Sequence, residues 1–145
     1  MVVRLRQLLR LANLALEKGA RRAIPLNTSG PFHTELLASA SNELKEKFVS
    51  VNFNEMQVPV IFNSSAKELE SGVSIAQMLE KQVMSSVYFE DSIRYMLENG
   101  VDTIIEIGPG KVLSGFIRKI DKTIKTYQVE DQASLEKTLA GLKGE

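Results

Sequence analysis

The segment from residue 103 to residue 120 constrains the fold more than any other stretch of the chain. Residues 103–107 (TIIEI) are rich in β-branched side chains, as a buried strand is. The sequence GPG at residues 108–110 then ends the apolar run, and the apolar residues that follow recur at helical spacing. A strand, a glycine turn and a helix in this order form the repeating unit of an α/β sheet. We therefore predict an α/β protein.

Similar patterns predict further elements on both sides of this unit. Helices are expected at residues 5–16, 34–49, 74–83, 89–97, 112–120 and 134–142, and strands at residues 23–26, 58–63, 103–107 and 126–129. Ser74 and Gln77 have the spacing of a capping box. Because strands alternate with helices, the sheet should be mainly parallel, with helices covering both of its faces.

Composition narrows the classes of function. Eighteen Lys and Arg residues balance eighteen Asp and Glu residues, and since neither sign forms a long block, we expect no nucleic-acid partner and no membrane partner. The chain has no cysteine, which excludes thiol nucleophiles and Cys-based zinc sites. With a single histidine as well, a metal site would need mostly carboxylate ligands, so no metal is expected.

Residues 1–16 mix arginines into an apolar run. The arginines interrupt each apolar stretch well short of a signal-peptide core or a membrane span. A helix of a water-soluble protein is the preferred interpretation. An amphipathic targeting segment is the alternative.

The only histidine, His33, lies in a turn before a predicted helix. Pro31 fixes its own φ and restricts Gly30, so the turn should present Phe32 and His33 in a defined direction. A strand at residues 23–26 would place this turn beyond a strand's carboxyl end, where open parallel sheets collect ligands. A histidine held there could act as a base near neutral pH. From the residues alone, a helix cap or a surface residue is the favoured alternative.

Residues 108–115 (GPGKVLSG) raise the possibility of a phosphate site. Glycines beside a helix N-terminus expose amides that can bind anions. The stretch lacks the G-x-x-x-x-G-K-[ST] spacing of a phosphate loop, so a plain strand-to-helix turn is the preferred interpretation. An independent flavodoxin-like domain that holds an anion at this loop is a weaker alternative.

Three stretches together resemble one enzyme family. They are IPLNTSGPFHTELL at residues 24–37, LEKQVMSSVYFEDSIRYM at 79–96 and IEIGPGKVLSGFIRKID at 105–121. In order and spacing they are similar to the C-terminal half of the malonyl-CoA:acyl carrier protein transacylases of bacterial fatty acid synthesis. The resemblance implies a partial α/β-hydrolase-like parallel sheet with helices on both faces and the tail of a ferredoxin-like small subdomain. Residues 1–29 would then be an atypical N-terminus and the end of that subdomain, and residues 30–145 the C-terminal half of the acyltransferase core.

The resemblance also implies an activity and its site residues. A serine would take malonyl from coenzyme A and pass it to the phosphopantetheine thiol of an acyl carrier protein, in the cytoplasm and without a cofactor. His33 would be the catalytic base, and the main-chain carbonyl of Gln82 would orient it. Phe32 would border the substrate and crowd a methyl branch, which favours malonyl over methylmalonyl.

The chain departs from the family in what it lacks. The family's nucleophile lies in a G-x-S-x-G elbow, and an arginine further along holds the malonyl carboxylate; neither motif occurs here. We therefore expect a C-terminal portion that is inactive alone, and that is marginally stable or associates with a missing N-terminal half. The alternative is a non-catalytic α/β module that binds a carrier protein or another subunit.

Overall fold

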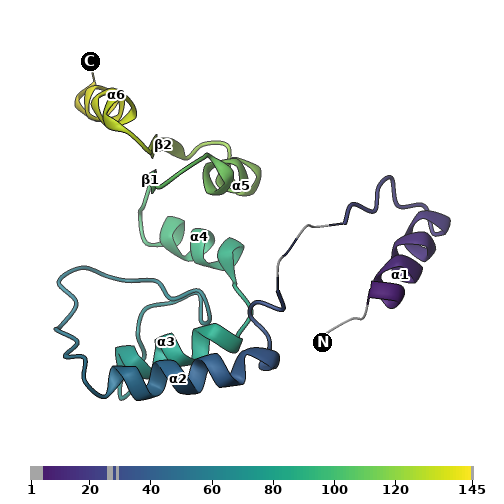
Figure 1. Cartoon of the computed structure of the whole chain (residues 1–145). Helices are drawn as coiled ribbons and strands as arrows, with labels where there is room; N and C mark the ends of the chain where they lie inside the picture. Colours follow the sequence, from purple (N-terminus) through teal and green to yellow (C-terminus); the bar gives the residue numbers. More distant parts are fainter. Residues whose placement is uncertain (1–4, 26–27, 29, 145) are drawn as a thin grey trace. The chain divides into compact units, whose positions relative to one another are not determined.

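The computed structural model describes residues 5–25, 28 and 30–144 (Figure 1). In this part of the chain the elements follow the order α1 (Leu5–Glu17), η1 (Glu35–Leu37, a 3₁₀ turn), α2 (Ala38–Phe48), α3 (Ile75–Met84), α4 (Phe89–Glu98), β1 (Thr103–Ile107), α5 (Val112–Ile120), β2 (Lys125–Val129) and α6 (Gln132–Lys143). The chain divides into two compact units: unit 1 contains Met1–Met56 and Leu69–Val87, and unit 2 contains Gln57–Glu68 and Tyr88–Glu145. The boundary expected after residue 29 stays a prediction.

Unit 2 is built on the strand, turn and helix that the sequence predicts. Strands β1 and β2 pair in parallel, with Ile105 opposite Tyr127, and α5 connects them. Successive side chains of a strand point to opposite faces of the sheet. On β2, Thr126 accepts a hydrogen bond from Arg118 of α5, whereas Tyr127 donates one to the carbonyl of Gly141 in α6. Helices α5 and α6 therefore lie against opposite faces of the sheet.

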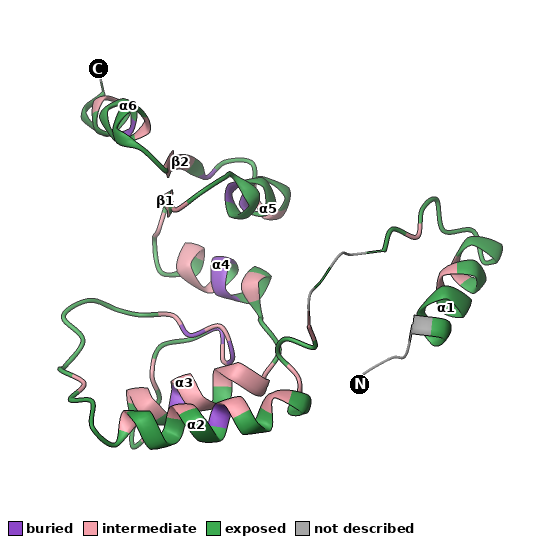
Figure 2. Cartoon of the chain, in the orientation of Figure 1, coloured by how far each residue is buried: buried purple, intermediate pink, exposed green. Residues whose placement is uncertain are grey.

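Helices α4 and α5 form the core of unit 2 together with one face of the sheet. Ile93, Ile117 and Ile124 are buried at its centre, and Figure 2 shows such buried positions (purple) in both helices. The ring of Phe89 meets that of Phe116 edge to face, with centroids 6.3 Å apart. Apart from Ile124, which lies in the loop before β2, these residues are apolar positions that the helical spacing predicts, so the pattern of the sequence determines the helical part of this core.

Unit 1 contains the antiparallel helices α2 and α3 (Figure 1). The start of α2 lies beside the end of α3, since the buried hydroxyl of Ser41 donates to the Glu80 carbonyl at 2.9 Å. The predicted capping box of α3 is confirmed. The Ser74 hydroxyl accepts from the Gln77 amide at 3.2 Å, and the Gln77 side chain accepts from the Ser74 amide at 2.8 Å.

Two of the predicted strands are absent from the described structure. Residues 23–25 have no regular structure and Leu26 lies outside the described residues, so the placement of the His33 turn at a strand end is wrong. Residues 58–63 contribute only an antiparallel bridge between Phe62 and Lys67. An apolar run becomes a strand only where a second strand pairs with its backbone, and Pro59 has no N–H to donate.

Candidate active site

The turn that carries His33 is held by short hydrogen bonds. The Thr34 hydroxyl donates to the Pro31 carbonyl at 2.7 Å, and the Leu37 amide donates to the Thr34 carbonyl at 3.0 Å. His33 itself has a φ of 58°, in the left-handed region that residues other than glycine rarely adopt. Strained backbone of this kind persists only where the surroundings hold it, and it concentrates at functional sites.

The imidazole of His33 meets the end of helix α3. Its Nδ1 atom lies 3.2 Å from the main-chain oxygen of Gln82. Since a carbonyl can only accept a hydrogen bond, this contact requires the hydrogen to be on Nδ1, which leaves Nε2 as an acceptor. The His33 residue is exposed, so an incoming group can reach the ring.

The Gln82 carbonyl is open to this contact because it belongs to the last turn of α3. The last four carbonyls of a helix have no partner within the helix. The two carbonyls before it accept bonds from hydroxyl groups. The Ser85 hydroxyl donates to the Lys81 carbonyl at 2.7 Å, and the Ser41 hydroxyl donates to the Glu80 carbonyl at 2.9 Å. Gln82 receives only a long bond of 3.4 Å from the Ser85 amide, and the imidazole completes its coordination.

Phe32 lies next to His33 in the same turn. Its side chain is 58% exposed, and its ring stands over Gly30, where an added Cβ would lie 3.6 Å from the ring. The structure thus brings an aromatic ring and an imidazole into one exposed turn. Ser29, in the same loop of the sequence, lies outside the described residues.

Ser41 is not among the residues that the sequence predicts for this site. Its signal was a polar residue on an apolar helix face, because it lies four residues after Leu37 and three before Leu44. A serine at such a position usually bonds a backbone carbonyl. Here that carbonyl belongs to Glu80, two residues before Gln82.

Backbone amides after β1 donate hydrogen bonds to carboxylates of the chain itself. The carboxylate of Glu106 accepts hydrogen bonds from the Leu113 amide (3.1 Å), the Ser114 amide (2.8 Å) and the Ser114 hydroxyl (2.6 Å). These bonds, the hydroxyl first, lower the pKa of Glu106. The Gly110 amide donates to Glu130 at 2.9 Å. Because these amides already have carboxylate partners, the loop is a structural turn.

Within residues 5–25, 28 and 30–144, no three His, Asp or Glu side chains group in a way that could hold a metal ion. None of the helices described is long and apolar enough to span a bilayer.

The chain matches no model of a known protein family. It is 45% identical over 134 residues to the malonyl CoA-acyl carrier protein transacylase of Bacillus subtilis (strain 168), a match that covers 92% of this chain and 42% of that protein. The crystal structure of malonyl CoA-acyl carrier protein transacylase from Clostridium perfringens is similar at a TM-score of 0.87 and 39% identity, over 97% of this chain and 44% of that one. A second similar structure, PlMCAT with holo AntF, is a type II PKS acyl-carrier protein in complex with its malonyl-transacylase. It matches at a TM-score of 0.82 and 30% identity, over 97% of this chain and 45% of the other.

The described fold is therefore similar to part of the transacylase fold. The chain is a homologue of the malonyl CoA-acyl carrier protein transacylases, which are transferases of fatty acid biosynthesis, and it is similar to their C-terminal part. It spans less than half the length of the relatives that it matches. This confirms the resemblance drawn from the three sequence stretches. The roles of His33, Gln82 and Phe32 stay predictions.

Proposed function

We propose that this chain carries the base of a serine-dependent acyl transfer, in which malonyl passes from coenzyme A to the phosphopantetheine thiol of an acyl carrier protein. In this proposal His33 is the catalytic base, the Gln82 carbonyl orients it, and Phe32 borders the acyl group. The serine would come from a G-x-S-x-G elbow, which this sequence does not contain. The chain alone is then inactive and works with an N-terminal half, in the cytoplasm.

One observation carries the proposal: the 3.2 Å contact between His33 Nδ1 and the Gln82 carbonyl. A general base must present a free nitrogen in a fixed direction. The carbonyl holds the hydrogen on Nδ1, and the hydrogen-bonded turn fixes the ring's attachment. The names of the relatives, which specify malonyl CoA and acyl carrier protein, support the choice of substrates.

The chemistry follows from this arrangement. Nε2 takes the proton of the serine hydroxyl while the serine oxygen attacks the thioester carbon of malonyl-CoA, and it returns that proton to the departing sulfur of coenzyme A. In the second half, Nε2 takes the proton of the phosphopantetheine thiol while its sulfur attacks the ester carbon of the malonyl-serine, and Nε2 returns that proton to the serine oxygen as its bond to malonyl breaks. The positive charge on the imidazole would face the Gln82 carbonyl and the negative end of the α3 dipole.

Phe32 gives the proposal a substrate preference. A phenyl ring beside the base leaves little room for a methyl group on the malonyl α-carbon. A misfit of this size costs about 1 to 3 kcal/mol in the transition state. Malonyl-CoA should therefore react faster than methylmalonyl-CoA by about tenfold or more.

The test is reconstitution of transfer from two pieces. This chain is mixed with an N-terminal half of a relative that carries the G-x-S-x-G elbow, and malonyl transfer from coenzyme A to the carrier protein is followed. Removing a general base slows such steps by about 10² to 10⁴, so we expect a loss of this size for His33→Ala. Gln82→Ala keeps the main-chain carbonyl and should have little effect.

Size-exclusion chromatography of each mixture shows whether the two pieces associate. Malonyl-CoA and methylmalonyl-CoA are offered separately, so the same assay measures the role of Phe32. Equal rates for the wild-type chain and His33→Ala in mixtures that associate equally would remove the assignment of the base. Equal rates for the two thioesters would remove that of Phe32.

A further inference from the structure

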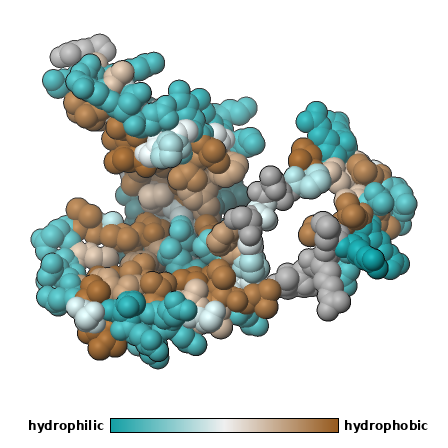
Figure 3. Space-filling view, viewed as in Figure 1, coloured by the Kyte–Doolittle hydropathy of each residue, from teal (hydrophilic) through white to brown (hydrophobic). Residues whose placement is uncertain are grey.

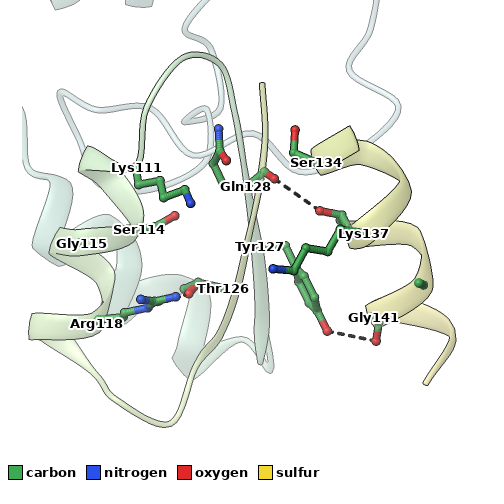
Figure 4. Close-up of a pocket in the computed structure, with 12 residues that line it drawn as sticks. Lys111, Ser114, Gly115, Arg118, Thr126, Tyr127, Gln128, Ser134, Lys137 and Gly141 are labelled. Atoms are coloured by element: carbon green, nitrogen blue, oxygen red, sulfur yellow. Dashed lines mark hydrogen bonds between the residues drawn. The ribbon is translucent and has the colours of Figure 1, made fainter. Parts of the chain in front are cut away.

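A cleft opens along the free edge of β2, within unit 2. It lies between α5 and α6 and has a volume of about 490 Å³ (Figure 4). This falls within the range of about 300 to 1,000 Å³ that is typical of small-molecule sites. Strand β1 covers the other edge of β2, so the cleft exposes side chains of one strand and two helices. We call it the β2 edge cleft.

Three cations line the β2 edge cleft. Lys111 and Arg118 come from the start and the end of α5, and Lys137 comes from α6. In Figure 4 the two lysines extend toward the cleft from opposite sides. The described residues that line it include no carboxylate. Like charges gathered in a cleft focus its potential and attract ions of the opposite sign.

Two acidic side chains beside α5 and α6 bind the helix ends and not the cations of the cleft. Glu106 binds the N-terminus of α5 through the Ser114 amide and hydroxyl. Asp131 caps α6 and accepts from Ser134, which lowers the pKa of Asp131. Within the described part of the chain, Lys111 and Lys137 have no acidic partner. Their charge is therefore available to a ligand.

Arg118 is oriented to bind two oxygens of one anion. Its Nε donates to the Thr126 hydroxyl at 3.1 Å, which fixes the plane of the guanidinium against β2. In the described structure its two terminal nitrogens have no partner. A guanidinium held in this way binds two oxygens of a phosphate group side by side.

Lysines beside a strand edge often serve only to prevent another strand from pairing there. In this case α6 already covers part of the edge, since the buried Thr138 hydroxyl donates to the Gln128 carbonyl at 3.4 Å. An added peptide strand would have to displace this bond. A compact anion does not need the backbone of β2, so the observations favour a small ligand over an extended peptide.

We propose that the β2 edge cleft binds a diphosphate group, through Arg118 and the two lysines that face each other across it. Two linked phosphates match a cleft that is lined by one guanidinium and two ammonium groups. The inference rests on this cleft alone and does not depend on the proposed acyl transfer. The diphosphate can be inorganic or part of a nucleotide, and the experiment separates these sources.

The experiment titrates the whole 145-residue chain with inorganic pyrophosphate and, separately, with ADP, by isothermal calorimetry at low and at moderate salt. We expect saturable binding with one site per chain. Arg118→Gln and Lys137→Gln should each weaken it by about tenfold, because each removes a charged hydrogen bond. Equal affinity for the two ligands assigns recognition to the diphosphate, and tighter ADP binding adds the nucleoside.

Lys119→Gln is the matched control. Lys119 is the next residue of α5 and lies over the Phe116 ring instead of the cleft. It should bind pyrophosphate as the wild-type chain does, and circular dichroism shows that each variant is folded. Binding that is absent at millimolar pyrophosphate, or that Lys119→Gln weakens as much as Arg118→Gln, would overturn the proposal.

Discussion

Glu106 links a strand to the helix that follows it. Its carboxylate extends from β1 and accepts hydrogen bonds from the amides of Leu113 and Ser114 at the N-terminus of α5, and from the Ser114 hydroxyl. A negative charge at this place also meets the positive end of the helix dipole. These contacts favour the ionised form, and so the pKa of Glu106 lies below its ordinary value. The ionised carboxylate is thus part of what holds α5 against the sheet.

Removing this charge should change how stability depends on pH. A carboxyl whose pKa is lowered by folding stabilises the protein above its unfolded pKa, and the contribution is lost as the pH falls through the folded pKa. Glu106→Gln should therefore lower the melting temperature at pH 7. The gap from the wild-type chain should close as the pH falls below about 4.5.

The control for this prediction is Glu136→Gln. Glu136 is exposed in α6, where its carboxylate accepts from Gln132, and its substitution should leave the melting temperature nearly unchanged at every pH. Thermal melts between pH 7 and pH 3 supply the measurement. A Glu106→Gln gap that stays constant over this range would show that packing, and not the charge, explains the loss.

The proposed site also shows which of its residues and contacts can be predicted from the sequence. The resemblance to transacylases pointed to His33 and to the carbonyl at position 82, and the structure brings these two groups within 3.2 Å. Neither the left-handed backbone of His33 nor the Ser41 bond to Glu80 could be predicted. Both depend on contacts between segments far apart in the sequence, which residue types and spacings do not specify.

Among the elements, α5 and α6 each contain a glycine, and the two differ in their surroundings. A Cβ on Gly115 in α5 would meet nothing within 4 Å. A Cβ on Gly141 in α6 would lie 2.6 Å from the Tyr127 ring, and the Tyr127 hydroxyl is tied to the Gly141 carbonyl at 3.0 Å. Close packing of α6 against the sheet thus requires a glycine at position 141.

Alanine at the two positions should act in opposite directions. Gly115→Ala should stabilise the chain by about 0.5 to 1 kcal/mol, because alanine favours a helix. Gly141→Ala gains the same propensity but forces Tyr127 away, and overpacking costs about 1 to 3 kcal/mol, so it should destabilise. Urea denaturation of both variants measures the difference. A stabilising Gly141→Ala would show that Tyr127 moves without cost.

The elements themselves could be predicted to different degrees. The helices follow from apolar spacing and from caps such as Ser74 with Gln77, because these signals are local. The strand at residues 103–107 is confirmed, and the strand predicted at residues 126–129 is found at Lys125–Val129. The strands predicted at residues 23–26 and 58–63 failed because a strand also needs a neighbour, which an apolar run does not reveal.

Over the whole molecule, burial is uneven between the two units. The buried residues described in unit 1 are Ser41 and Met78, whereas unit 2 buries a larger set, namely Phe62, Ser64, Ala66, Ser92, Ile93, Ser114, Ile117, Ile124 and Thr138. Large apolar side chains remain at the surface of both units (brown in Figure 3), among them Leu8 in α1 and Ile107, which is 82% exposed. Unit 2 therefore has the stronger core.

Amide hydrogen exchange should reveal this difference. Opening free energies follow the density of buried contacts, so amides of β1, β2 and α5 should exchange more slowly than those of α2 and α3. Exchange measured by mass spectrometry at neutral pH provides the comparison. The proposed catalytic turn and the Gln82 carbonyl belong to the less protected unit. Equal protection in both units would indicate a single cooperative structure instead.

The division of the molecule also limits how it can be dissected. Each unit is assembled from two separate stretches of chain, so the backbone passes from one unit to the other three times. The hairpin around Phe62 belongs to unit 2, where the Asn63 carbonyl accepts from the Tyr88 amide at 2.9 Å. No single proteolytic cut can release either unit intact, and a shortened gene that starts at codon 88 would encode unit 2 without this hairpin.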